Sequence, residues 1–110
     1  MTDDLPTGVW VDAHLARLSA RGAFFTVVRK GDPSRGTVML KLFAARDRCK
    51  IVQQERNWDD EDRMGWVTLF RGAVVPESTA DDHIDGALAQ DPDLWVIEIE
   101  DGALENPFDL

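Results

Sequence analysis

Two helix-like segments enclose a run of strand-like segments, and this order limits the fold more than any other feature. Residues 9–22 and 75–92 carry apolar residues at the three- and four-residue spacing of an amphipathic helix. Segments rich in β-branched and aromatic residues fill the space between and after them. The order α-β-β-β-β-α-β predicts an α+β fold, a five-stranded and mainly antiparallel sheet with two helices packed on one face. The expected strands are residues 23–30, 37–44, 49–56, 66–72 and 93–101.

Turn-forming residues connect the first two strands. The sequence GDPSRG at residues 31–36 combines Pro33 with a glycine at each end, so we expect a β-hairpin there. The last strand alternates most clearly between two faces. Its faces carry Trp95, Ile97 and Ile99 on one side and Val96, Glu98 and Glu100 on the other.

The ends of both helices are marked by the residues that helix ends favour. Asp12 suits the first turn of the first helix, and Gly22 suits its end. Ser78 or Thr79 can cap the second helix, which Pro92 ends. Together with the strands, the helices predict a core of Leu15, Leu18, Val27, Leu40, Leu42, Ile84, Leu88, Trp95, Ile97 and Ile99.

One domain accounts for the chain. Its 110 residues, 44% hydrophobic and 30% charged, are typical of a single globular domain. We divide it into an N-terminal arm at 1–8, the α+β domain at 9–101 and a loosely attached tail at 102–110. The acidic N-terminus is unlike a secretory signal, and no apolar run reaches roughly 18 residues, so we expect a cytoplasmic protein without a membrane partner.

Charge is distributed unevenly along this acidic chain. The formal net charge of −9 argues against broad binding to nucleic acid. From Arg17 to Lys50, however, the local balance is +7, whereas residues 72–110 hold eleven acids and no lysine or arginine. The two regions either form an interaction surface or lie side by side and neutralise one another.

The basic hairpin at residues 29–37 is the candidate for a ligand site. Backbone N–H groups in such a turn can cradle an anion, and cationic side chains beside it can clamp a phosphate or carboxylate. The candidate anion-binding residues are Arg29, Lys30, Ser34 and Arg35.

A competing interpretation gives the hairpin's cations a structural role. Opposite charges that face each other across strands stabilise a sheet by roughly 0.2 to 1 kcal/mol per pair. Under this interpretation the acidic last strand neutralises the cations, and under a third they remain in solvent. The proposed pairs join Arg29, Lys30 and Lys41 to Glu98 and Glu100.

Catalytic and metal-binding patterns are not recognisable in the sequence. His14, His83 and Cys49 share no ligand spacing, and the acidic run at 59–62 lacks the glycine and spacing of a calcium loop. The cationic neighbours of Cys49 point to the opposite face of a strand, so we expect a buried thiol. We therefore assign no catalytic residue, metal or cofactor, and an enzyme is not favoured.

Trp58 is the candidate contact for a protein partner. It lies in the polar loop ERNWDDED, where burial of a large side chain is hardest to arrange. An exposed tryptophan can anchor an interface. The alternative is that the ring folds over the base of its own loop.

Three segments together resemble a known family. They are the helical segment VWVDAHLARLSARG, the turn K-G-D-x-x-x-G-T from Lys30 to Thr37, and D-P-D-L-W from Asp91 to Trp95. From about Leu5 to Asp101 the chain is similar to short, mostly alphaproteobacterial proteins known only as a domain of unknown function. The resemblance implies a bacterial, cytosolic, single-domain protein, and it brings no activity, cofactor or catalytic residue with it.

Two function classes are compatible with these features. Charge segregation without a catalytic motif favours a small non-enzymatic binding or protein-interaction module, whose partner is another protein or a second copy of the chain. The alternative is a small-anion or nucleotide binder, conceivably an enzyme, that uses the hairpin at 29–37.

Overall fold

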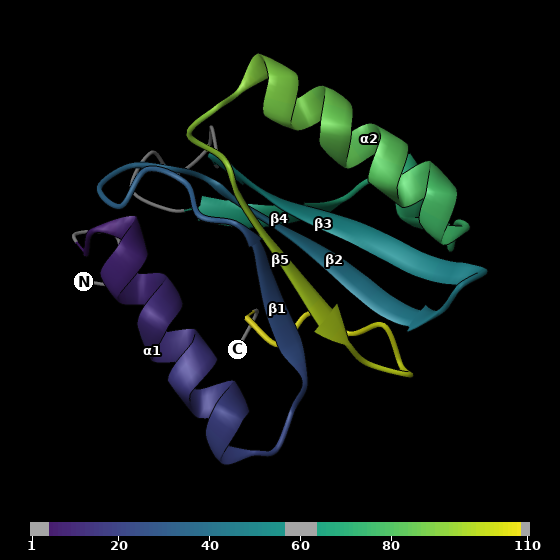
Figure 1. Ribbon diagram of the computed structural model, residues 1–110, viewed down its shortest axis with the longest axis horizontal. Coiled ribbons are helices and arrows are strands. Elements are labelled where there is room, and N and C mark those ends of the chain that lie inside the picture. The colour runs from purple at the N-terminus through teal and green to yellow at the C-terminus, as the bar shows by residue number, and fades with distance from the viewer. Residues whose placement is uncertain (1–4, 57–63, 109–110) are drawn as a thin grey trace.

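The computed structural model describes residues 5–56 and 64–108, which form two helices and one mixed five-stranded sheet (Figure 1). The α+β class and the expected order of helices and strands are confirmed. The sheet order is β1-β5-β2-β3-β4. The elements are α1 (Thr7–Ala20), β1 (Phe25–Arg29), β2 (Val38–Ala45), β3 (Arg48–Arg56), β4 (Met64–Thr68), the 3-10 helix η2 (Phe70–Gly72), α2 (Glu77–Gln90) and β5 (Trp95–Glu100).

The strand β5 lies between β1 and β2, so the hairpin expected at residues 31–36 is wrong. β5 runs antiparallel to β1 and parallel to β2, the one parallel pair of the sheet. Every residue of β5 from Trp95 to Ile97 is buried, and a central position gives such a strand neighbours on both edges. The loop after β1 therefore crosses the start of β5, and its turn chemistry does not make a tight reversal.

The two helices pack on opposite faces of the sheet, so the expectation that they share one face is wrong. The central strand β2 explains the difference, because five consecutive residues from Val38 to Leu42 are buried and both of its faces need cover. The first core cluster gathers α1 with alternate strand residues: Val11, Leu18, Val38, Leu40, Leu42, Trp95, Ile97 and Ile99. The second gathers α2 with the residues between them: Met39, Cys49, Ile51, Val75, Ala80, Ile84, Leu94 and Val96.

The helix α1 begins earlier than expected and ends where expected. It starts at Thr7 after Pro6, so the first-turn position expected for Asp12 is wrong. At the other end Gly22 has a φ of 75°, and its N–H donates to Ser19 O. Ala23 N–H donates to Leu18 O at 3.0 Å, which completes a Schellman motif and confirms the stop at Gly22.

The helix α2 lacks the side-chain cap that the sequence suggested. It begins at Glu77 after Pro76, so Ser78 and Thr79 lie inside its first turn and do not cap it. It ends at Gln90, just before the expected stop at Pro92. In the described part of the chain, neither helix is both long and apolar enough to cross a lipid bilayer.

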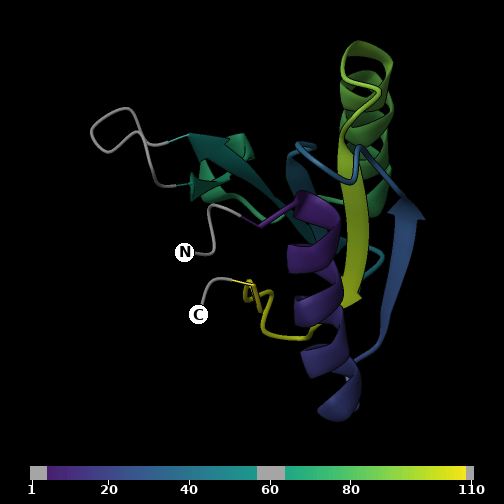
Figure 2. The same ribbon diagram turned by 90° about the vertical axis from the view of Figure 1, so that its left-hand side faces the viewer.

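The segment after β5 is packed against the domain, and the loose attachment expected for it is wrong. Leu104 and Phe108 are 6% and 3% exposed and join the α1 side of the core, where Figure 2 shows this segment beside α1. The Phe108 ring stacks on His14, with ring centroids 4.5 Å apart. Burial, and then the cation of Arg17, lower the pKa of His14, so its ring is held neutral against Phe108 and accepts a hydrogen bond from Arg17.

The core expected from the sequence is largely confirmed, with one clear error. Leu15 and Leu88 are half-buried, and the other expected core residues except Val27 are buried. Val27 is 39% exposed because β1 is an edge strand that the helices cover only in part.

Candidate functional site

The loop between β1 and β2 closes over the start of β5. Asp32 N–H donates to Asp93 O at 3.0 Å, and the Trp95 indole N–H donates to Asp32 O at 2.8 Å. Cβ atoms at Gly31 and Gly36 would collide with Asp93 O and the Trp95 ring, so both positions require glycine. The turn motif and the D-P-D-L-W motif are therefore the two halves of one contact.

The same loop also holds the start of α1. Thr7 and Gly8 donate their backbone N–H groups to Ser34 O and Pro33 O, and the Thr7 hydroxyl donates to Gly36 O at 2.9 Å. The first N–H groups of a helix have no partner within the helix and need an outside acceptor. Carbonyls of the loop supply it, so the loop joins the start of β5 to the first turn of the helix that carries the third family-like segment.

The backbone donors of the turn are already occupied by acceptors within the chain. Ser34 and Arg35 donate their N–H groups to the Asp32 carboxylate at 2.7 and 3.1 Å, and Gly36 donates to Asp32 O. The hydrogen bonds from Ser34 and Arg35 lower the pKa of Asp32. The carboxylate of Asp32 already accepts the backbone N–H groups that would cradle an anion. An anion at this turn would therefore be bound by side chains alone.

The four residues of the hypothesised anion site remain on the surface. Arg29, Lys30, Ser34 and Arg35 are all exposed. Among the residues that the structure describes, none of the three cations forms an ion pair, so the strand pairing expected for Arg29 and Lys30 is not seen. In the register of β1 with β5, Arg29 faces Val96, and an uncharged Thr26 faces Glu98.

Lys41 is the cation for which the pairing expectation is confirmed. Its ammonium lies 3.1 Å from a Glu98 carboxylate oxygen, and Lys41 and Glu98 face each other in the parallel β2–β5 pair. The sequence did not reveal two further partners, Glu77 and Asp81, whose carboxylates each lie 2.7 Å from the same nitrogen. The spacing of these two acids, one helical turn apart, was the signal that could have found them.

The environment of Lys41 fixes it as a permanent cation. Its side chain is only 5% exposed. Burial alone lowers the pKa of a lysine, but hydrogen bonds to Asp81, Glu77 and Glu98 outweigh it and raise the pKa above its ordinary value. A lysine that acts as a base or forms a Schiff base needs a lowered pKa, so the geometry supports a structural ion cluster between α2 and the sheet.

The expectation of a buried thiol at Cys49 is confirmed. Cys49 is fully buried, and its Sγ lies 3.6 Å from Ala45 O. Burial raises the pKa of this thiol, although the cation of Lys41 acts in the opposite direction. A nucleophilic cysteine needs the reverse shift and an open approach.

The remaining sequence candidates do not come together. His14 lies on the α1 side of the sheet, whereas Cys49 and His83 lie on the α2 side. In the part of the chain that is described, His, Cys, Asp and Glu side chains form no group of three that could hold a metal ion. Trp58 and the acidic run at 59–62 lie outside the described residues.

The outer edge of β1 is an open hydrogen-bonding edge. Glu100 N–H donates to Phe24 O, and Thr26 faces Glu98 one step further along, so these residues bond across to β5. In an antiparallel pair the alternate residues, here Phe25 and Val27, direct their N–H and C=O groups away from the partner strand. β1 is terminal in the sheet (Figure 1), so these groups point away from it.

Apolar side chains surround this edge and cations follow it. Phe24, Val28 and Val27 are 72%, 50% and 39% exposed. Arg29 and Lys30 come next, where a bulge ends the regular pairing with β5. We call Phe24 to Lys30 the β1 edge, and it is the best-formed candidate for an interaction surface in the described chain.

The fold and this edge define a small α+β domain that has one helix on each face of a mixed sheet and an uncovered strand at the β1 end. Residues 5–109 match the family described as "Protein of unknown function (DUF1491)". The chain belongs to this family, which confirms the resemblance seen in the sequence.

Solved structures that are similar to this chain share its fold. A crystal structure of a DUF1491 protein from Caulobacter crescentus is 33% identical, covers 90% of this chain and 88% of its own, and has a TM-score of 0.74. An NMR structure of a DUF1491 protein from the same organism is 32% identical, with coverages of 94% and 92% and a TM-score of 0.78. The solution structure of protein Atu0922 from A. tumefaciens is 26% identical, with coverages of 89% and 86% and a TM-score of 0.72. None of the curated proteins matches the chain.

Proposed function

We propose that the protein is a non-catalytic binding module that takes an extended, acidic segment of a partner protein as an additional strand beside β1. The observation that carries this proposal is the outer edge of β1, which pairs with no other strand within residues 5–56 and 64–108 and has outward backbone groups at Phe25 and Val27 with exposed apolar side chains beside them. Strand addition uses such an edge, because main-chain hydrogen bonds give affinity and alternate side chains give specificity.

Charge favours an acidic partner strand. Arg29 and Lys30 are exposed at the end of the β1 edge, and neither pairs with an acid in the described part of the chain. A second copy of the chain would add two more cations to the same edge, whereas an acidic segment would neutralise the existing ones. Proteins commonly protect an edge with charges and bulges, and here that protection begins only after Val27.

The proposal is tested with a pair of short peptides that alternate valine with charge. The acidic probe is acetyl-Glu-Val-Glu-Val-Glu-amide and the control is its lysine counterpart. In a titration followed by backbone amide NMR signals, the acidic peptide should shift the signals of residues 24–30 in a saturable way, and the basic peptide should not.

Two variants at one position separate main-chain pairing from simple charge attraction. Val27→Pro removes an N–H that points to solvent, which an edge strand tolerates, while Val27→Thr keeps the N–H. Binding should be lost in the proline variant and retained in the threonine variant. Equal binding by both variants would exclude strand addition. If light scattering showed a dimer without peptide, and Val27→Pro abolished it, the partner strand would be β1 of a second copy of the chain and not an acidic segment.

The exposed cations of the loop support a second candidate, a small-anion or nucleotide binder. Arg29, Lys30 and Arg35 remain in solvent while the backbone donors of the turn are occupied, so side chains alone would hold the anion. A thermal-shift screen of phosphorylated metabolites tests this idea. A ligand at a hundredfold excess over Kd should stabilise the wild type by about 2.7 kcal/mol and the Arg35→Ala variant by less, and no difference between them would exclude the site.

A further inference from the structure

A groove between α2 and β3 forms a second site that is separate from the β1 edge. It has a cavity volume of about 450 Å³ and is lined by residues of α2, of β3 and of the segment that leads into β5. This volume is within the range of small-molecule sites in proteins. Ala87 and the buried Leu94 supply its apolar lining.

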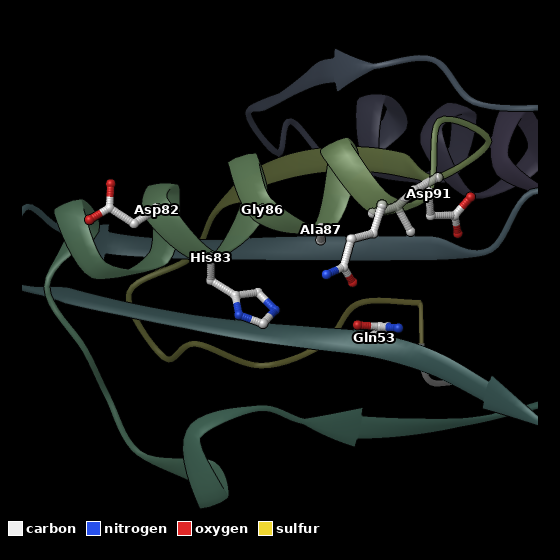
Figure 3. Close-up of a pocket in the computed structure, with 8 residues that line it drawn as sticks. Gln53, Asp82, His83, Gly86, Ala87 and Asp91 are labelled. Carbon is white, nitrogen blue, oxygen red and sulfur yellow. The ribbon is translucent and has the colours of Figure 1, made fainter.

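Polar side chains from two elements face this groove. The His83 side chain extends from α2 toward β3, and Gln53 lies on β3 beneath α2 (Figure 3). Gln90 lines the groove one turn beyond Gly86. Within residues 5–56 and 64–108, the side chains of these three residues donate and accept no hydrogen bonds, and the His83 ring contacts the ring of Phe70 edge-on at 5.5 Å. Within these residues, their polar atoms are therefore left to a ligand or to solvent.

Gly86 leaves space over the groove at a cost to the helix. It lies in the interior of α2, where glycine is less stable than alanine by about 1 kcal/mol. A Cβ atom at this position would have no neighbour within 4 Å, so close packing within the domain does not require glycine here. The missing side chain instead keeps the wall of the groove open beside His83 and Gln90.

Charge in the groove favours a cation. Asp82 and Asp91 line it, and no lysine or arginine does. The end of the groove near Asp91 lies at the C-terminus of α2. Helix carbonyls carry partial negative charge there, so a cation is the favoured neighbour. The last turn of α2 has no basic residue, and the C-cap residue is Asp91 itself.

We propose that the groove binds a small organic cation with planar donors, an alkylguanidinium. Carboxylate and amide oxygens accept hydrogen bonds, and a guanidinium presents five donors in one plane, which suits the oxygens of Asp91, Gln53 and Gln90. Its alkyl chain packs on Ala87 and Leu94. The same group occurs in free metabolites and in arginine side chains of proteins, so the test includes both.

The test is a titration of the full chain with propylguanidine, followed by amide NMR signals, beside the neutral and similarly shaped propylurea. Propylguanidine should shift the signals of Gln53 and of residues 83–91 in a saturable way, and propylurea should bind at least about tenfold more weakly, the ratio that corresponds to 1.4 kcal/mol. The peptide acetyl-Gly-Arg-Gly-amide forms the second arm. Tighter binding of this peptide would assign the site to an arginine side chain of a protein, and tighter binding of propylguanidine would assign it to a free metabolite.

Matched variants locate the site. Asp91→Asn keeps the side-chain oxygen that accepts Asp93 N–H but removes the charge, and it should weaken binding about tenfold. Asp85→Asn removes the same charge from the same helix outside the groove and should change binding less than about twofold. Gly86→Leu should block the groove while α2 stays folded, because leucine is a better helix former than glycine.

Three results would overturn the proposal. They are no saturable shift with either cation, equal shifts with propylurea, and equal effects of Asp85→Asn and Asp91→Asn, which would indicate general attraction to an acidic helix. None of them bears on the β1 edge, so this inference and the proposed function can fail separately.

Discussion

Lys41 is the residue whose environment differs most from what its type suggests, because it is a lysine in the middle of a buried strand. Its hydrogen bonds to Glu77 and Asp81 tie α2 to β2, and Glu98 adds a contact to β5. The cluster is asymmetric, because the lysine is buried while the three acids are 28% to 51% exposed. Solvent therefore screens the acids in part, and the central cation holds them together.

Replacing Lys41 with methionine should destabilise the protein by about 3 kcal/mol. Methionine fills similar space, but the three carboxylates would then lie close together without a cation, and each lost hydrogen bond to a charged group contributes about 1.5 to 3 kcal/mol. Urea unfolding followed by circular dichroism measures the change. The control is Lys30→Met at an exposed position, which should stay within about 0.5 kcal/mol. Equal stabilities of the two variants would show that the cluster contributes little.

At the scale of single elements, the loop from Lys30 to Thr37 organises three others. It supplies acceptors to the first turn of α1, it covers the start of β5 through Asp32, and it leads from β1 into β2. Its glycines allow the close approach to Asp93 and Trp95. The basic turn seen in the sequence is therefore a loop that packs against the start of β5. Its cationic side chains lie on the surface.

Substituting Gly36 with alanine should destabilise the protein by about 1 to 3 kcal/mol. The added methyl group meets Asp93 O and the Trp95 ring in a buried position, and overpacking of this kind forces the backbone to move. Gly102→Ala is the matched control, because a Cβ there meets nothing within 4 Å. The midpoint of thermal unfolding distinguishes the two, and a Gly36→Ala variant as stable as Gly102→Ala would contradict the packing role of the loop.

The order of elements could be predicted from the sequence, but the sheet order could not. Periodicity and turn residues depend on local sequence, and they located two helices and five strands in the right order, although the fourth strand ends at Thr68 and Phe70–Gly72 form a 3-10 helix. The placement of β5 between β1 and β2 depends on contacts between residues more than 50 positions apart, such as Lys41 with Glu98. The hairpin error followed from this, because GDPSRG has turn chemistry whether or not the flanking strands are neighbours.

The candidate sites were predictable only in part for the same reason. The charge of Arg29 and Lys30 is visible in the sequence, but the open edge beside them is a property of the sheet order. Val27 was expected in the core because its residue type is apolar, and only its place on a terminal strand exposes it. The groove needs Gln53 and Gly86 together, and these residues share no sequence motif.

At the scale of the whole molecule, acidic and basic regions do not neutralise each other within the described chain except at Lys41. The ion pairs of this part all involve Lys41, so no acid of this part pairs with Arg29 or Lys30 at the β1 edge. The acidic residues of α2 lie over β2 and β3 on the other side of β5 from this edge. The domain therefore presents an apolar, basic strand edge at one end and an acidic groove on α2, and the two are suited to different ligands.

Amide hydrogen exchange along β1, measured with and without the acidic peptide, tests the central claim most directly. In the free protein, Thr26 N–H should be protected by its pairing with Glu98, while Phe25 and Val27 N–H should exchange rapidly. Addition of the peptide should protect Phe25 and Val27 and leave the outward-facing amides of the β4 edge unchanged. Slow exchange at Phe25 and Val27 in the free protein, or exchange that the peptide does not alter, would contradict the account of β1 as an open docking strand.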